Sequence, residues 1–89
     1  MDPQNAKAYL YRGMIYDAQK QYDPALTDYN TALRFNPHFQ DAYFIRGEFY
    51  YLHDKKDLAL ADLNKVLELN KNYRSAEYVR KMIKALESK

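Results

Sequence analysis

The chain repeats itself after thirty-four residues, and this repeat limits the folds that it can adopt. Twelve of the thirty-four pairs from 6/40 to 39/73 are identical, where chance would give roughly two. A period of this length is typical of stacked supersecondary units, each of which needs a neighbour to bury its apolar face. The identical pairs are Ala8/Ala42, Tyr9/Tyr43, Arg12/Arg46, Gly13/Gly47, Tyr16/Tyr50, Asp23/Asp57, Ala25/Ala59, Leu26/Leu60, Asp28/Asp62, Asn30/Asn64, Leu33/Leu67 and Asn36/Asn70.

The first copy predicts two helices. The first helix should cover about 5–18, where the recurring residues follow three-four spacing. The second should begin at Asp23-Pro24, with Asp23 as the N-cap and Pro24 at the first helical position. Asn36-Pro37 should stop it, because the residue before a proline disfavours the helical region. Its predicted buried stripe is Ala25, Tyr29, Ala32, Leu33 and Phe35.

The second copy predicts a matching pair, and one further helix follows it. We expect helices over about 39–52 and from the N-cap Asp57 to about Asn70, then a last helix over about 73–86. Asn36 and Asn70 occupy equivalent helix ends, where Asn tolerates a left-handed backbone. The apolar stripe of the fourth helix is Ala59, Leu60, Leu63, Val66, Leu67 and Leu69.

The recurring glycines predict close contact within each helix pair. Gly in a helix interior costs roughly 1 kcal/mol relative to Ala, so packing should more than offset that cost. A residue without a side chain on the first helix lets the second, which carries a recurring Ala, approach closely. Replacing Gly13 or Gly47 with Leu should therefore lower the stability by more than about 1 kcal/mol.

The bulk properties exclude several classes of protein. With 47% hydrophobic and 29% charged residues, the chain is globular. It has no Cys, so it has neither a disulfide framework nor thiol chemistry. Its net charge of +2 is too small to argue for a nucleic-acid or membrane partner. No apolar run reaches the length of a membrane span and no signal peptide is visible, which favours a cytoplasmic location.

The spacing resembles that of the tetratricopeptide repeat, across essentially the whole chain. The family pattern is a bulky residue, Leu, Gly and Tyr, followed by Ala, an aromatic, Ala and Pro. The second copy departs from it with Leu63 for the aromatic, Val66 for Ala and Lys71 for Pro, and both copies carry Arg in place of Leu. The matching residues are Tyr9, Gly13, Tyr16, Ala25, Tyr29, Ala32 and Pro37, then Tyr43, Gly47, Tyr50, Ala59, Leu63 and Val66.

The resemblance implies one all-α domain, a right-handed solenoid of two antiparallel helix hairpins and a capping helix. Repeat one should span about 6–39, repeat two about 40–73 and the capping helix about 74–88. In the last helix Lys81 replaces the recurring Gly, as suits a helix that solvates the end of a stack. Asp2-Pro3 falls where a preceding repeat would end, which is the pattern of a piece of a longer array or of an engineered chain.

The resemblance also implies a protein–protein interaction scaffold without catalysis or cofactor. In the family, the first helix of each repeat lines a concave groove that binds a peptide or a helix. The Lys and Asn clamp with which some members grip a C-terminal carboxylate is absent, and an apolar ligand fits better. The implied groove residues are Leu10, Met14, Asp17, Phe44, Glu48, Tyr51, Leu52, Tyr78 and Met82, with Leu10, Met14, Phe44, Tyr51 and Tyr78 carrying the contact.

Two other functions compete with this one. Tyr11 and Ile15 lie where an earlier repeat would cover them, so the chain could be a structural unit that stacks end to end with copies of itself. The mixture of Arg and Tyr also suits single-stranded RNA, although no nucleic-acid partner is expected. His38 and His53 lie in predicted connections without Cys or carboxylates at metal-ligand spacing, so neither a metal site nor an enzyme is expected.

Overall fold

The computed structural model describes residues 5–88, and these residues form five helices and no strand. The helices are α1 (Ala6–Ala18), α2 (Tyr22–Phe35), α3 (Gln40–Leu52), α4 (Lys56–Leu69) and α5 (Ala76–Glu87). The predicted all-α, helical-repeat class is therefore confirmed. The expected role of Asp2-Pro3 lies outside the described residues.

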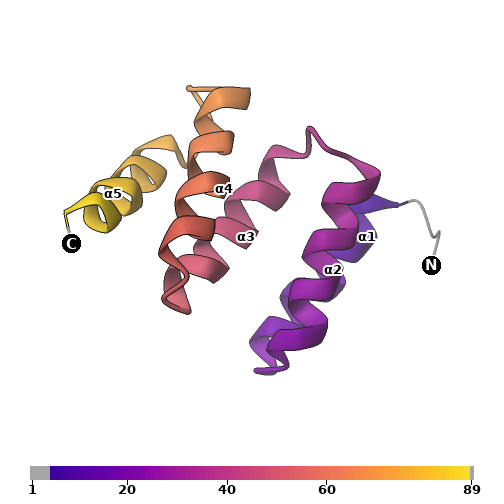
Figure 1. Ribbon diagram of the computed structural model, residues 1–89. Coiled ribbons are helices and arrows are strands. Elements are labelled where there is room, and N and C mark those ends of the chain that lie inside the picture. Colours follow the sequence, from indigo (N-terminus) through magenta and orange to yellow (C-terminus); the bar gives the residue numbers. More distant parts are fainter. Residues whose placement is uncertain (1–4, 89) are drawn as a thin grey trace. The chain divides into compact units, whose positions relative to one another are not determined.

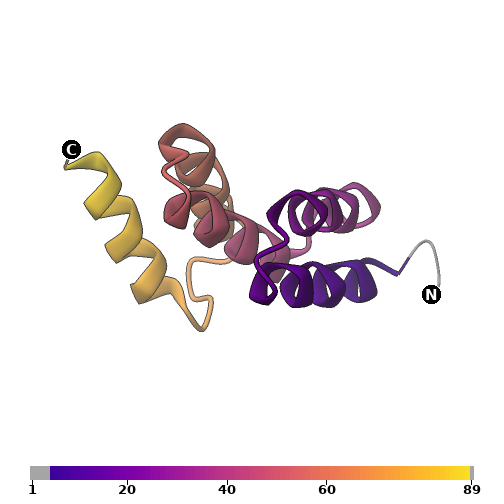
Figure 2. The same cartoon turned by 90° about the horizontal axis from the view of Figure 1, so that it is seen from below.

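The chain divides into two compact units, Met1–Ala42 and Tyr43–Lys89. In the first unit, α1 and α2 run antiparallel and lie side by side (Figures 1 and 2). The second unit holds nearly all of α3, together with α4 and α5, and α4 contacts α5. Each unit thus contains one helix hairpin, and α5 joins the second.

The core of the first unit lies between α1 and α2. Ala25, Tyr29 and Ala32 have no exposed surface, and Leu33 is 7% exposed. A Cβ on Gly13 would lie 2.7 Å from Cε1 of Tyr29 and 3.1 Å from the Ala25 carbonyl oxygen. The close approach predicted for Gly13 is confirmed, and the ring of Tyr29 is the group that makes it tightest. Phe35, expected in the same stripe, is instead 39% exposed, and its ring stacks on Tyr9 at 5.8 Å.

The core of the second unit draws on all three of its helices. Ala59, Leu63 and Val66 of α4 have no exposed surface, and neither has Val79 of α5. A Cβ on Gly47 of α3 would lie 3.0 Å from Cδ2 of Leu63. The second glycine therefore marks a close approach too, with an aliphatic side chain in place of the Tyr29 ring.

The predicted N-caps of α2 and α4 are wrong. Each helix begins two residues earlier, after Gln21 and Lys55, so Asp23 and Asp57 lie in the first turn. In the first turn, the negative charge of each Asp interacts favourably with the helix dipole, but its side chain does not cap the helix. Pro24 is tolerated in the first turn because its missing N–H would have no partner within the helix.

A left-handed residue explains why both helices begin early. Lys20 has φ 62° and Asp54 has φ 60°, and these two positions are one repeat apart. The Gln21 N–H donates to the Tyr16 carbonyl at 2.8 Å, and the Lys55 N–H donates to the Tyr50 carbonyl at 2.9 Å. The same tight turn thus joins the helices of each hairpin.

The left-handed backbone expected at Asn36 and Asn70 is not observed. Both residues are extended, with φ of −139° and −161°. Their side chains accept hydrogen bonds from the backbone N–H groups of His38 and Asn72, at 3.1 and 2.9 Å. Asn ends each second helix by closing a side-chain turn, which is another reason for its preference at such positions.

The last helix begins three residues later than predicted. The N–H of Tyr73 donates to the Asn70 carbonyl at 3.1 Å, and the N–H of Ala76 donates to the Tyr73 carbonyl at 2.8 Å. These bonds form turns, and α5 starts only after them, at Ala76. Tyr73 is 7% exposed, with its ring 5.7 Å from that of Phe44, so the turn places an aromatic anchor in the second unit.

Candidate functional site

A bidentate ion pair joins the two helices of each hairpin. Nε and Nη2 of Arg12 donate to the Asp28 carboxylate, both at 2.8 Å. Nε and Nη2 of Arg46 donate to Asp62 in the same way, at 2.7 and 2.8 Å. The aspartates are only 2% and 4% exposed. Sequence reasoning missed these pairs, although the recurrence of Arg and Asp sixteen residues apart in both copies was a signal for them.

Two tyrosine rings flank each of these arginines. The Arg12 guanidinium carbon lies 5.6 and 5.7 Å from the ring centroids of Tyr9 and Tyr16. Its pKa is raised, first by the hydrogen bonds to Asp28. Burial lowers the pKa of Arg46, but the hydrogen bonds and the charge of Asp62 raise it, and the net shift is upward. The rings and carboxylates together hold the arginines in place within the hairpins.

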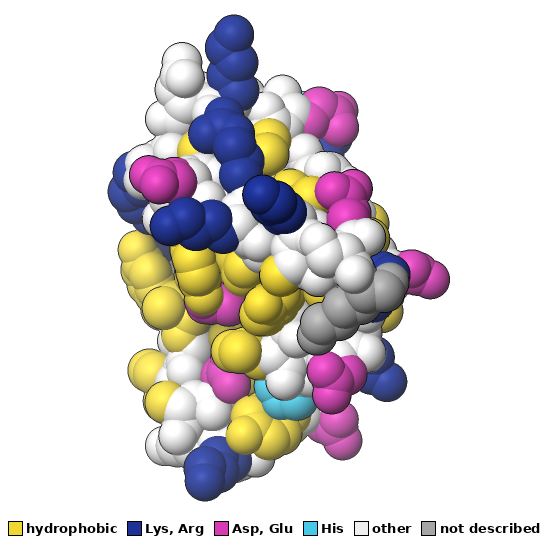
Figure 3. Space-filling model, turned by 90° about the vertical axis from the view of Figure 1, so that its left-hand side faces the viewer, with side chains coloured by type: hydrophobic (Ala, Val, Ile, Leu, Met, Phe, Trp, Pro, Cys, Tyr) yellow, Lys and Arg dark blue, Asp and Glu magenta, His cyan; other side chains and the backbone are white. Residues whose placement is uncertain are grey.

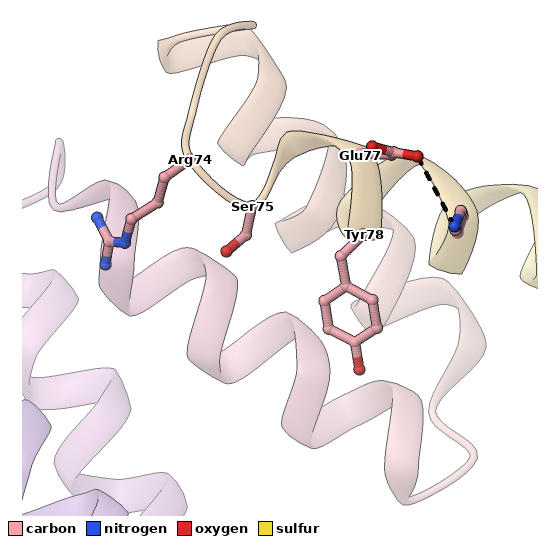
Figure 4. A pocket seen from close by; sticks show the side chains of 5 residues that line it. Arg74, Ser75, Glu77 and Tyr78 are labelled. Atoms are coloured by element: carbon pink, nitrogen blue, oxygen red, sulfur yellow. Dashed lines mark ion pairs between the residues drawn. The ribbon is translucent and has the colours of Figure 1, made fainter.

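Three of the predicted groove residues meet between α3 and α5. The Tyr78 hydroxyl donates to Oε2 of Glu48 at 2.7 Å. The Phe44 ring lies edge-on to Tyr78 at 6.0 Å and packs near Tyr73. The hydrogen bond to Glu48 is the largest cause that raises the pKa of Tyr78, and burial adds to it. Figure 4 shows the Tyr78 side chain pointing from α5 toward α3, and its hydrogen bond to Glu48 links these two helices.

An apolar hollow lies beside this cluster, where α3 ends. Tyr51 and Leu52 line it together with Leu86 of α5, and Asp54 and Lys56 form its charged edge. Its volume is about 270 Å³. Leu52 is the most exposed large hydrophobic residue of the chain among the described residues, at 67%. A shallow apolar surface with a charged edge suits an apolar side chain of another protein.

A second hollow of about 380 Å³ is lined mainly by residues with polar or charged side chains. It is lined by Arg74 and Ser75 before α5, and by Glu77, Tyr78 and Lys81 on it (Figure 4). Glu77 and Lys81 form an exposed ion pair at 3.7 Å. The face that Figure 3 shows gathers Lys and Arg side chains toward its upper end, with hydrophobic side chains below them. Charged side chains thus line the hollow that Tyr78 borders.

Two predicted groove residues do not reach the surface. Leu10 is 2% exposed and Met82 is 3% exposed. Both follow the helical spacing of their neighbours, but they pack inside the protein. Asp17 of the first unit is half-buried and accepts a hydrogen bond from the Tyr29 hydroxyl at 3.1 Å. Met14 is 42% exposed and remains available for contact.

The face assigned to self-association is exposed. Tyr11 is 57% exposed and Ile15 is 58% exposed, and both lie on α1. Met14, 42% exposed, lies between them on the same side of the helix. Within the described part of the first unit, these three side chains form an apolar surface.

The histidines lie in the connections, as predicted. His38 is in the turn before α3, and His53 follows α3, where its ring stacks on Phe49 at 4.3 Å. Among the described residues, no group of three or more His, Cys, Asp or Glu could hold a metal ion. Over residues 5–88, no helix is both long enough and apolar enough to cross a membrane.

The family model described as Tetratricopeptide repeat matches residues 6–39, and a second model of the same description matches residues 40–73. This chain belongs to the tetratricopeptide repeat family. Tetratricopeptide repeats are generally protein–protein interaction modules and typically act as non-catalytic scaffolds. No curated protein matches the chain.

Three residues of the apolar hollow in this tetratricopeptide repeat protein were not expected from the sequence. Leu86 lies thirty-four positions after Leu52, so the repeat period itself could have pointed to it. Asp54 and Lys56 lie in and just after the tight turn that follows α3. Their positions at the edge of the hollow depend on the left-handed backbone of Asp54, which no sequence pattern predicts.

Proposed function

We propose that this chain binds a peptide or amphipathic helix of a partner protein, and that the hollow lined by Tyr51, Leu52 and Leu86 receives an apolar side chain of that ligand. The observation that carries the proposal is the meeting of these three side chains around one hollow of the second unit, where Leu52 is 67% exposed and Leu86 is largely buried. Buried aromatic and aliphatic anchors supply most of the binding energy of interfaces.

The aromatic cluster next to the hollow makes the surface suitable for binding. Tyr78 is held by Glu48, and Phe44 is held by Tyr73 and Tyr78. Side chains that are already ordered lose little conformational entropy when a ligand binds. Because the hollow is small, we expect the affinity for a single peptide to be modest.

A peptide library displayed on phage and selected against the immobilised protein tests this proposal. The binding of a selected peptide is then measured by calorimetry for the wild type, Leu52→Ala and Leu58→Ala. Leu58 is the matched control, because it is an exposed leucine on α4, at 52%. We expect Leu52→Ala to weaken binding about tenfold or more and Leu58→Ala to change it by less than about twofold. Equal losses in both variants would contradict the proposed site.

The exposed residues Tyr11 and Ile15 favour a second candidate, self-association through α1. Single-stranded RNA has less support, because Asp28 and Asp62 compensate the charges of Arg12 and Arg46. Raising the salt concentration separates RNA binding from peptide binding, since RNA affinity falls steeply with salt.

A further inference from the structure

Helix α1 presents an apolar row along one face. Tyr11, Met14, Ile15 and Ala18 are all exposed, and their spacing of three, four and seven places them on the same side of the helix. The row contains no charged residue. A continuous apolar row at the surface marks a place where another surface packs.

The repeat shows what happens when these positions are covered. Sixty-eight residues later, the same positions on α5 carry Val79, Met82, Ile83 and Leu86. In the second unit, where α5 contacts α4, Val79, Met82 and Leu86 are no more than 6% exposed. In this repeat, therefore, the row is a packing face for another helix.

The outer face of α5 does not match this row. Its exposed side chains include Glu77, Arg80, Lys81 and Lys84. Stacking one copy on the end of another through α5 would place the apolar row against charges that lose their water. The same row on a second copy is an apolar surface of equal length without a charge, and it therefore matches the row.

We propose that two copies pair through α1 in an antiparallel, two-fold arrangement; this deepens the self-association candidate and leaves the peptide-binding proposal independent of it. In such a pair, residue i contacts residue j and residue j contacts residue i. Tyr11 then meets Ile15 of the second copy, and Met14 lies near the axis. Lys7 near the start of α1 is exposed, and Asp17 near its end is half-buried and accepts a hydrogen bond from Tyr29; the antiparallel direction places these unlike charges at the same end of the pair.

The size of the row predicts a weak dimer. Stable complexes bury roughly 1,200 Å² or more, and four side chains from each copy fall short of this. We therefore expect a dissociation constant of about 100 µM or weaker. Such a dimer forms at high protein concentration.

Sedimentation equilibrium of the whole chain from about 10 µM to about 1 mM tests the pairing, because mass action makes the dimer depend on concentration. We expect the mean mass of the wild type to rise toward twice the monomer mass. Ile15→Lys should remain monomeric, whereas Leu58→Lys, which alters an exposed leucine on α4, should behave as the wild type. A constant monomer mass for the wild type, or equal association of Ile15→Lys, would overturn the proposal.

A single cysteine separates two-fold pairing from end-to-end stacking. The chain has no Cys, so Met14→Cys and the control Leu58→Cys each carry one thiol. Two-fold pairing brings the two Met14→Cys thiols within disulfide range near the axis, and we expect a covalent dimer on mild oxidation. Cross-linking no greater than that of Leu58→Cys would overturn the two-fold arrangement. Binding of the selected peptide to Ile15→Lys reports on the hollow separately, so the two proposals can fail independently.

Discussion

Arg46 on α3 holds the buried carboxylate of Asp62 on α4 with two hydrogen bonds, at 2.7 and 2.8 Å. The side chain of Asp62 is 6% exposed, whereas that of Arg46 is 20% exposed. The corresponding pair of the first unit is wetter, because the Arg12 side chain is 47% exposed. The two pairs have the same geometry and different access to water, and they should therefore contribute differently to stability.

We expect Asp62→Ala to destabilise the protein by about 2 kcal/mol, because it leaves a partly buried guanidinium without its carboxylate. Asp28→Ala should cost less, since water can solvate the more exposed Arg12. Urea unfolding followed by circular dichroism measures the loss of stability in both variants. Glu68→Ala is the control: it breaks the exposed Lys65–Glu68 pair at 3.3 Å and should cost less than about 0.5 kcal/mol. A loss for Asp62→Ala as small as that control would contradict this account.

The two glycines should respond differently to alanine. At Gly13 a Cβ would lie 2.7 Å from the Tyr29 ring, which has no exposed surface and whose hydroxyl donates to Asp17. At Gly47 the nearest atom is a Leu63 methyl carbon at 3.0 Å. Alanine gains roughly 1 kcal/mol of helix propensity at either site.

We therefore expect Gly13→Ala to lower the free energy of unfolding by about 1–2 kcal/mol, and Gly47→Ala to change it by less than about 1 kcal/mol. Thermal unfolding of both variants ranks them. A Gly13→Ala protein that is at least as stable as the wild type would show that the ring moves aside without cost. The larger replacements, Gly13→Leu and Gly47→Leu, should both be destabilising by more than about 1 kcal/mol.

Much of this fold follows from the sequence because the residues that determine the packing occur at the same positions in both repeats. The close approach at Gly13 and Gly47, and the helix ends at Asn36 and Asn70, recur at the same register. The predictions that were wrong concern the local structure at the helix ends. Asp23 and Asp57 have the chemistry of an N-cap, but the left-handed residue three positions earlier lets the helix begin before them.

The candidate site was harder to predict than the fold. The family resemblance implied that Leu10 and Met82 line the groove, but a mapped position gives only a direction around the helix and not what lies there, and both are buried. Asp28 and Asp62 show the opposite difficulty: a charged residue is normally expected on the solvent side, but both are buried. Only the pairing with Arg12 and Arg46, visible in three dimensions, explains their burial.

The hydrogen bond from Tyr78 to Glu48 should make stability depend on alkaline pH. Because the pKa of Tyr78 is raised in the folded protein, the folded state binds more protons than the unfolded state above about pH 10. The contribution of Tyr78 is therefore complete below the unfolded pKa and is lost as the pH rises through the folded pKa. Burial also raises the pKa of Tyr50, so the wild type must be compared with Tyr78→Phe.

We expect the stability of the wild type to fall more steeply above about pH 10 than that of Tyr78→Phe. Glu48→Gln should bring the pKa of Tyr78 closer to its ordinary value, because it removes the charged acceptor. Titration of carbon-13-labelled tyrosine by NMR measures this pKa directly. An unchanged titration midpoint in Glu48→Gln would contradict the role given to the hydrogen bond.

Glycine at the left-handed position of the first hairpin should stabilise the protein. Lys20 has φ 62°, a conformation that costs an ordinary residue roughly 1 kcal/mol or more and a glycine nothing. Glycine also adds freedom to the unfolded chain, which offsets part of the gain. We expect Lys20→Gly to raise the free energy of unfolding by about 0.5 kcal/mol. Asp54→Gly should gain less, because Asp tolerates this region better.

Lys55→Gly is the matched control for that experiment. Lys55 has φ −99°, so glycine relieves no strain there and only adds entropy to the unfolded chain. We expect it to lower the stability by up to about 1 kcal/mol, in the opposite direction to Lys20→Gly. Urea unfolding of the two variants under identical conditions gives the comparison. If both glycines destabilise equally, the turn at Lys20 stores no strain, and the early start of α2 needs another cause.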